Sequence, residues 1–69
     1  MSTYKAIIKK DGGWWIGWIE EIPGVNCQGK TRKELVENLR SALTEALEMN
    51  RAEAIAAAKG KYIEESIAL

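Results

Sequence analysis

Several residue types are missing or nearly missing from this chain. Its 69 residues include no histidine and no phenylalanine, and only one cysteine and one proline. A single cysteine excludes an intrachain disulfide, and without histidine it does not complete a typical zinc site. Histidine is also the usual base that activates a cysteine or serine nucleophile. The sequence therefore argues against an enzyme, we expect no cofactor or metal, and we interpret Cys27 as a small buried residue.

Net charge and long apolar runs are absent as well. Lysine and arginine together number ten, as do aspartate and glutamate. Nucleic-acid-binding domains usually carry an excess of basic residues on one face, so this balance argues against that class. The longest wholly apolar run is residues 54–58, whereas a membrane-spanning helix needs about 20 residues. With one free thiol and no export signal, we expect a cytoplasmic protein that does not enter a membrane.

The length of the chain limits its stability. Residues 1–69 suffice for a single domain, and a domain of this size buries only about 60% of the surface that its unfolded chain exposes. Small domains usually gain stability from disulfides, metals or oligomerisation. Because the first two are not expected here, we predict a homodimer or a homotetramer.

Strand and turn patterns occupy the first half of the chain. Residues 3–10 alternate between two faces, and Asp11-Gly12-Gly13 follows with residues typical of a hairpin turn. Residues 14–21 form the second predicted strand, which is apolar on both faces at its start and suits a central strand covered on both sides. Pro23-Gly24 predicts a turn, and residues 25–29 predict a short third strand.

A capped helix follows the predicted strands. Thr31-x-x-Glu34 is a capping box, in which the threonine side chain accepts a hydrogen bond from the Glu34 amide. Apolar residues then recur every three or four positions, which predicts a long amphipathic helix packed on one face of the sheet. The predicted buried stripe consists of Leu35, Leu39, Ala42, Leu43, Ala46 and Leu47.

The helical pattern has two interpretations beyond Asn50. The first helix either continues through this residue, or Asn50 caps a second, short helix over residues 51–59. We favour the second interpretation, because asparagine is a better helix cap than a helix-interior residue. Gly60 predicts the end of the helical region.

Residues 61–69 predict a last strand. Ile63, Ile67 and Leu69 share one face of it, and Glu65 interrupts that face. An edge position, or pairing with another chain, would keep the Glu65 carboxylate in water. The predicted fold is therefore α+β: a three-stranded antiparallel meander, a long helix on one face of the sheet, a short helix and a C-terminal strand.

Three tryptophans lie close together in the second predicted strand. One interpretation is a platform that stacks nucleic-acid bases, which normally accompanies a positively charged groove. The other, which we favour, is that they form core or oligomer contacts, because aromatic residues dominate both. The predicted core and oligomer residues are Trp14, Trp15, Trp18, Leu35, Leu39, Leu43 and Leu47.

Short motifs in this chain match a known family. They are Asp11-Gly12-Gly13-Trp14, Ile22-Pro23-Gly24, and Gln28-Gly29-Lys30-Thr31-x-x-Glu34-Leu35-x-x-Asn38-Leu39. In residues and spacing, over nearly the whole chain, they resemble the HicB family of antitoxins from type II toxin–antitoxin systems. Lys30 departs from the pattern, since the family often has an acidic residue there.

The resemblance implies a β-β-β-α-β domain similar to a trimmed ribonuclease-H-like fold without its catalytic carboxylates. It also implies a partner, because HicB-like proteins bind and block small HicA toxins that cleave messenger RNA. Many members add a C-terminal helix-turn-helix or ribbon-helix-helix domain that binds DNA. Residues 1–69 leave no room for one, so the chain resembles the short HicB type, and we do not expect it to bind DNA alone.

The predicted function is that of a HicB-like antitoxin module, which neutralises a HicA-type toxin by covering its active site. The alternative is a homo-oligomeric structural protein of the same fold with no toxin partner. A basic toxin would meet acidic side chains at the strand ends and the polar face of the helix. The candidate partner-binding residues are Glu20, Glu21, Lys33, Glu37, Arg40 and Thr44.

Overall fold

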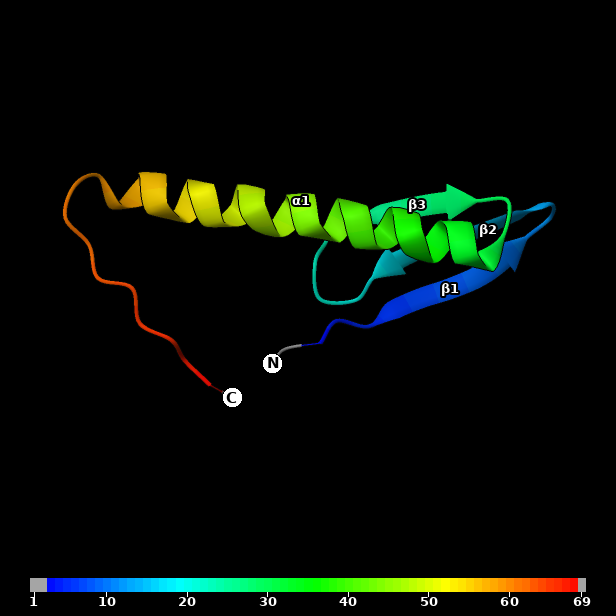
Figure 1. Cartoon of the computed structure of the whole chain (residues 1–69), viewed down its shortest axis with the longest axis horizontal. Coiled ribbons are helices and arrows are strands. Elements are labelled where there is room, and N and C mark those ends of the chain that lie inside the picture. Colours follow the sequence, from blue (N-terminus) through cyan, green and yellow to red (C-terminus); the bar gives the residue numbers. More distant parts are fainter. Residues whose placement is uncertain (1–2, 69) are drawn as a thin grey trace.

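The computed structural model describes residues 3–68 of the chain. They form a three-stranded sheet and one long helix, in the order β1 (Ala6–Asp11), β2 (Trp14–Ile19), β3 (Asn26–Gly29) and α1 (Arg32–Ala58). Figure 1 shows the helix lying across the sheet and continuing well beyond it. The predicted α+β class and the antiparallel meander are therefore confirmed.

The strands β1 and β2 form a hairpin around the two glycines that follow Asp11. Their antiparallel register pairs Ala6 with Ile19 at one end and Asp11 with Trp14 at the other. Gly12 has a φ of 62°, in the left-handed region that favours glycine. This is the turn that the Asp-Gly-Gly sequence predicts.

A second turn brings β3 back beside β2. Gly24 has a φ of 87°, and the Ile19 amide donates a hydrogen bond to the Val25 carbonyl oxygen over 3.1 Å. From there β3 pairs antiparallel with β2 along its whole length. The strand β2 is thus central, as predicted, and the strand order in the sheet follows the sequence.

The helix begins where the capping motif predicts. The Thr31 hydroxyl oxygen accepts a hydrogen bond from the Glu34 amide at 3.1 Å. One turn further on, the Asn38 side-chain amide donates to the Gln28 carbonyl oxygen at 3.1 Å. The first bond satisfies a free amide at the helix start, and the second ties the helix to β3.

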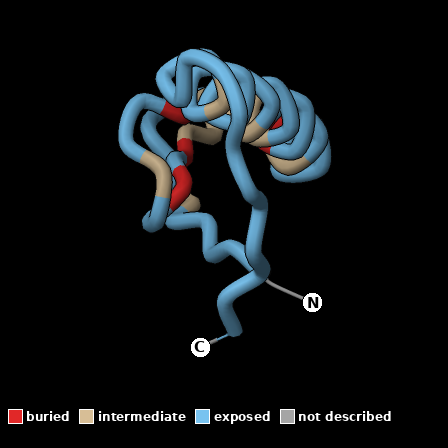
Figure 2. The backbone as a smooth tube through the Cα atoms, turned by 90° about the vertical axis from the view of Figure 1, so that its left-hand side faces the viewer, coloured by how far each residue is buried: buried red, intermediate tan, exposed pale blue. Residues whose placement is uncertain are grey.

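The core lies between β2, the β2–β3 turn and the first turns of α1. Its buried residues are Ile19, Val25, Leu35 and Leu39, and Figure 2 shows buried positions on both the sheet side and the helix side. Partly buried neighbours pack around them: Ile8, Trp15, Ile22, Cys27, Ala42, Leu43 and Ala46. The predicted helical stripe is therefore confirmed as far as Ala46.

Two glycines let the helix approach the sheet closely. A Cβ atom at Gly29 would lie 2.7 Å from the backbone nitrogen of Leu35. A Cβ atom at Gly17 would lie 3.2 Å from side-chain carbons of both Leu35 and Leu39. The two buried leucines therefore pack directly against the sheet only because Gly17 and Gly29 carry no side chain.

The prediction of a second helix from Asn50 is wrong. The helix α1 runs without a break from Arg32 to Ala58. Residues 51–58 are rich in alanine, and extending an existing helix avoids the unfavourable nucleation of a new one. Lys59 caps the end of the helix with a left-handed φ of 49°, and Gly60 follows with a φ of 125°.

The predicted C-terminal strand is not present in the described residues. Residues 61–68 form neither helix nor strand, and the orange-to-red segment of Figure 1 turns at the end of α1 and runs back below the helix. Ile63 is 90% exposed and Ile67 is 82% exposed. A strand needs a neighbouring strand to satisfy its backbone hydrogen bonds, and alternation of side chains alone does not provide one. Leu69, which ends the predicted strand, lies outside the described residues.

The helix covers only part of the sheet. It packs on β2 and β3, whereas over residues 3–68 no Cα atom of α1 lies within 8 Å of a Cα atom of β1. The register turns Ala6, Ile8 and Lys10 of β1 toward the helix layer, yet only Ile8 is half-buried. The strand β1 therefore has a free edge and an uncovered surface beside the helix.

Candidate interaction surface

The face of the sheet opposite α1 is exposed to solvent and largely apolar. It carries Trp14, Ile16 and Trp18 of β2, and the register pairs Ile7 of β1 with Trp18. We call these four residues the open sheet face. Trp14 and Trp18 are 42% and 40% exposed. The expectation that β2 is covered on both sides is wrong for the single chain, because α1 supplies a layer on one side only.

Polar and charged side chains surround the open sheet face. Lys9 and Gln28 pair with Ile16 from its two sides. The Lys30 ammonium nitrogen lies 5.9 Å from the centroid of the Trp14 ring, within the range of a cation–π contact. An apolar centre with a polar rim is the usual composition of a protein–protein interface.

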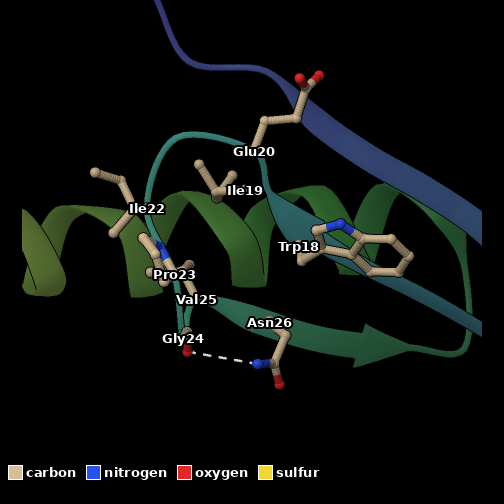
Figure 3. A pocket seen from close by; sticks show the side chains of 8 residues that line it. All are labelled: Trp18, Ile19, Glu20, Ile22, Pro23, Gly24, Val25 and Asn26. Atoms are coloured by element: carbon tan, nitrogen blue, oxygen red, sulfur yellow. Dashed lines mark hydrogen bonds between the residues drawn. The ribbon is translucent and has the colours of Figure 1, made fainter.

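A hollow of about 540 Å³ adjoins the open sheet face at the β2–β3 turn. Figure 3 shows Trp18 at one side of it and the Glu20 carboxylate pointing away from the turn. The Asn26 side-chain amide donates to the Gly24 carbonyl oxygen at 3.5 Å on the far side. Its lining residues are Trp18, Ile19, Glu20, Ile22, Pro23, Gly24, Val25 and Asn26. The hollow extends the apolar surface beyond the end of β2.

The residues predicted to bind a partner fall into two separate groups. Glu20 and Glu21 follow β2, and the Glu21 carboxylate accepts hydrogen bonds from the Lys5 amide at 3.1 and 3.4 Å. The exposed helix group consists of Lys33, Glu37, Arg40 and Thr44. The Thr44 hydroxyl is already occupied, because it donates to the Arg40 carbonyl oxygen at 2.9 Å. The two groups come from different elements, the turn after β2 and the helix α1.

The residues predicted for core or oligomer contacts also fall into two groups, one packed in the core and one outside it. Leu35 and Leu39 are buried, and Leu43 and Trp15 pack against them. Trp14 and Trp18 lie outside the core of the single chain, on the open sheet face, so their predicted role in core or oligomer contacts is left with oligomer contacts, which stay a prediction. Leu47 is half-buried but lies outside the core cluster. Alternation indicates which side chains share a face, but it does not indicate which face the helix covers.

A shallow groove lies on the helix side of the sheet, between β1 and α1. Its volume is about 160 Å³, and it is lined by Ala6, Ile19, Val36, Leu39, Arg40 and Leu43. All of these except Arg40 are apolar. Sequence reasoning missed this groove, because it arises from the position of α1 over β2 and β3, and no residue pattern in the sequence signals that offset.

Cys27 lies in β3 and packs against the core, as predicted. Burial raises the pKa of its thiol above the ordinary value. A raised pKa lowers the fraction of reactive thiolate at neutral pH, so the site does not favour a cysteine nucleophile. Among the residues that the structure describes, no three cysteine or carboxylate side chains gather closely enough to hold a metal ion.

Comparison of this chain with protein-family models, with curated proteins and with solved structures found no match. The resemblance to HicB antitoxins therefore rests on the sequence motifs alone. Over residues 3–68, no helix combines the length and the apolar character that crossing a membrane requires.

Proposed function

We propose that this chain is a HicB-like antitoxin module that neutralises a small HicA-type, mRNA-cleaving toxin by covering the active site of the toxin. It would act by binding alone, with no reaction of its own. The observation that carries the proposal is the open sheet face, which leaves two tryptophans about two-fifths exposed on a very small domain. Exposed apolar patches of this kind usually mark interaction sites.

The residues that carry the resemblance have structural roles in this chain. Gly12 and Gly24 adopt the left-handed conformations of the two turns. Thr31 caps the helix, and Asn38 bonds it to β3. These roles support a scaffold like that of the family, and they leave partner binding to surface residues outside the motifs.

The open sheet face is the better candidate for the toxin contact than the polar face of the helix. Tight interfaces usually have an apolar centre with aromatic anchors, and Trp14 and Trp18 can supply both. The exposed helix group has no aromatic residue among its members. Glu20 lines the hollow beside Trp18, where its carboxylate would attract a basic toxin and make binding sensitive to salt.

The test of the proposal is coexpression with the product of the neighbouring reading frame, followed by affinity purification. A short basic protein that copurifies, and whose RNA cleavage stops when this chain is added, supports the antitoxin function. The proposal fails if no such reading frame exists and no small basic RNA-binding protein copurifies from the native host.

Two substitutions then test the surface. Trp18→Ser removes an aromatic anchor and should weaken toxin binding roughly tenfold or more. Glu20→Lys reverses a charge on an exposed residue and should weaken binding without affecting the fold. Lys33→Glu, on the helix, is the matched control and should still inhibit the toxin. Loss of inhibition by Lys33→Glu alone would instead assign the contact to the helix face.

A homo-oligomeric structural protein without a toxin partner is the second candidate function. The uncovered β1 and the length of α1 beyond the sheet favour it, because both leave surface without a partner in the single chain. Size-exclusion chromatography with light scattering distinguishes the candidates. A stable homo-oligomer that captures no toxin supports the second.

A further inference from the structure

The tryptophans of β2 differ in what lies over their rings. The Lys10 ammonium nitrogen lies 5.6 Å from the centroid of the Trp15 ring, and the Lys30 nitrogen lies 5.9 Å from that of Trp14. In the part of the chain that the structure describes, no lysine or arginine lies over Trp18 in this way. Trp18 is nevertheless 40% exposed. It is therefore an exposed aromatic ring that lacks the cation its two neighbours have.

The surface around Trp18 is hollowed. The hollow of about 540 Å³ at the β2–β3 turn extends from Trp18 beyond the end of β2. A second hollow, of about 350 Å³, extends from Trp18 in the other direction along the strands. The second hollow is lined by Ile16, Gly17, Trp18, Asn26, Cys27 and Gln28. Because both hollows include Trp18 and Asn26, a side chain laid across the indole has room on either side.

The polar groups beside this ring can accept hydrogen bonds. Glu20 follows Trp18 by two residues, which places both on the same face of a strand. Asn26 pairs with Trp18 across the strands, and its amide nitrogen donates to the Gly24 carbonyl oxygen at 3.5 Å, which leaves the amide oxygen as an acceptor. In Figure 3 the Glu20 carboxylate projects outward, and the one hydrogen bond among the residues drawn joins Asn26 to Gly24.

A guanidinium group has the chemistry that this site requires. It is planar and carries N–H donors but no acceptor, so it can stack on an aromatic ring and pair with a carboxylate at the same time. An ammonium group has no flat face and is more strongly hydrated. The methylene groups of an arginine can also lie along the apolar wall that Ile22 and Pro23 give the hollow.

We infer that Trp18 and Glu20 form a subsite for an arginine side chain of a basic protein partner, with the guanidinium stacked on the indole and paired with the carboxylate. Glu20 is exposed, so its side chain can rotate between staggered conformations and turn toward a guanidinium on the ring. The inference rests on the proposed function, because it names the residue type that a basic toxin would insert beside Trp18. The subsite itself can be tested without the toxin.

Binding of short peptides to this chain tests the subsite. The probes are blocked Gly-X-Gly tripeptides, in which X is arginine, lysine or citrulline, an uncharged residue with the shape of arginine. Nitrogen-15 NMR at constant ionic strength follows the Trp18 indole N–H and the backbone amides of residues 19–26 during each titration. The arginine peptide should give saturable shifts centred on Trp18, the lysine peptide should bind about threefold more weakly or worse, and citrulline should not saturate.

Substitutions then assign the contact to the two residues. Glu20→Gln and Trp18→Leu should each raise the dissociation constant of the arginine peptide about threefold or more. The matched controls are Glu37→Gln, on the helix, and Trp14→Leu, whose ring already has Lys30 over it. Each control should change the constant by less than about twofold.

A further variant should strengthen binding. The Lys5 carbonyl oxygen accepts a hydrogen bond from the Glu20 amide at 2.9 Å, so the Lys5 side chain starts beside Glu20. Its ammonium group competes for the carboxylate, and Lys5→Ala should therefore lower the dissociation constant of the arginine peptide.

Equal binding of the three peptides refutes the inference, as do shifts centred away from Trp18. Unchanged binding by Glu20→Gln refutes it as well, and this exposed substitution is informative even if Trp18→Leu does not fold. Toxin inhibition without arginine binding would refute this inference alone. Arginine binding by a chain that captures and inhibits no toxin would instead refute the antitoxin proposal.

Discussion

Replacing Gly29 by alanine tests the closest approach between the sheet and the helix. A Cβ atom there would lie 2.7 Å from the Leu35 nitrogen, and 3.2 Å from the carbonyl carbon of Glu34 and the Leu35 Cα. All three are backbone atoms of the helix, so no side-chain rotation relieves the clash. The helix must move away from β3, which loosens the packing of Leu35 in the core.

The expected change in the free energy of unfolding is the difference between two opposing contributions. Overpacking of this kind costs about 1–3 kcal/mol. Alanine also reduces the entropy of the unfolded chain, which offsets about 0.4–1 kcal/mol at a position without a positive φ, as here. The net loss of stability is therefore at most about 2.6 kcal/mol, with a midpoint of about 1.3 kcal/mol, at which the Tm should fall by about 5–10 °C. That is a large part of the roughly 3–10 kcal/mol that a domain of this length possesses.

Thermal and urea unfolding, followed by circular dichroism at one protein concentration, measure the difference. Gly13→Ala is the matched control, because a Cβ atom there meets nothing within 4 Å and its φ is not positive. This control should be as stable as the wild type or slightly more stable. If the two alanine variants are equally stable, the close contact between β3 and α1 does not exist, and the position of the helix over β3 is wrong.

Three further predictions concern single side chains. Asn38→Ala removes the bond to the Gln28 carbonyl and should lower the free energy of unfolding by about 0.5–1.5 kcal/mol in urea, whereas an unchanged value would mean that the bond contributes nothing. Thr31→Ala removes the helix cap and should cost about 1 kcal/mol, with Thr31→Ser as the control that keeps a hydroxyl. Cys27 should react with iodoacetamide more slowly in the folded chain than in urea, because its pKa is raised by burial. The thiol therefore loses its proton at a lower pH in the unfolded chain than in the folded chain. As a result, the free energy of unfolding should fall as the pH rises through the ordinary thiol pKa of about 8.5. Cys27→Ala should abolish that decline.

Local signals in the sequence predicted the parts of the fold that are decided locally. The Asp-Gly-Gly turn, the Pro-Gly turn and the cap at Thr31 each depend on residues within a few positions of one another, and all three are present. The failure at Asn50 has a similar local origin. Its preference for capping is weaker than the combined helix propensity of the alanine-rich residues that follow it.

The parts that failed depend on contacts between distant residues. Alternation placed Trp14 and Trp18 on one face, but only the position of α1 determines which face is buried. Alternation also predicted a strand around Ile63 and Ile67, but the sequence does not indicate which edge of the sheet would pair with that strand. The groove beside β1 was missed for the same reason, because it is formed by the offset of one layer over another.

The uninterrupted order β1-β2-β3 has a consequence for how the chain folds. Each strand pairs with its neighbour in the sequence, and α1 packs on the two strands that precede it. Contacts of such short sequence separation favour folding on the order of milliseconds or faster. The core is complete once Ala46 is in place, so during synthesis from the N-terminus it can form before the last residues of the chain exist. Folding and association are then separate steps, and only the second should depend on protein concentration.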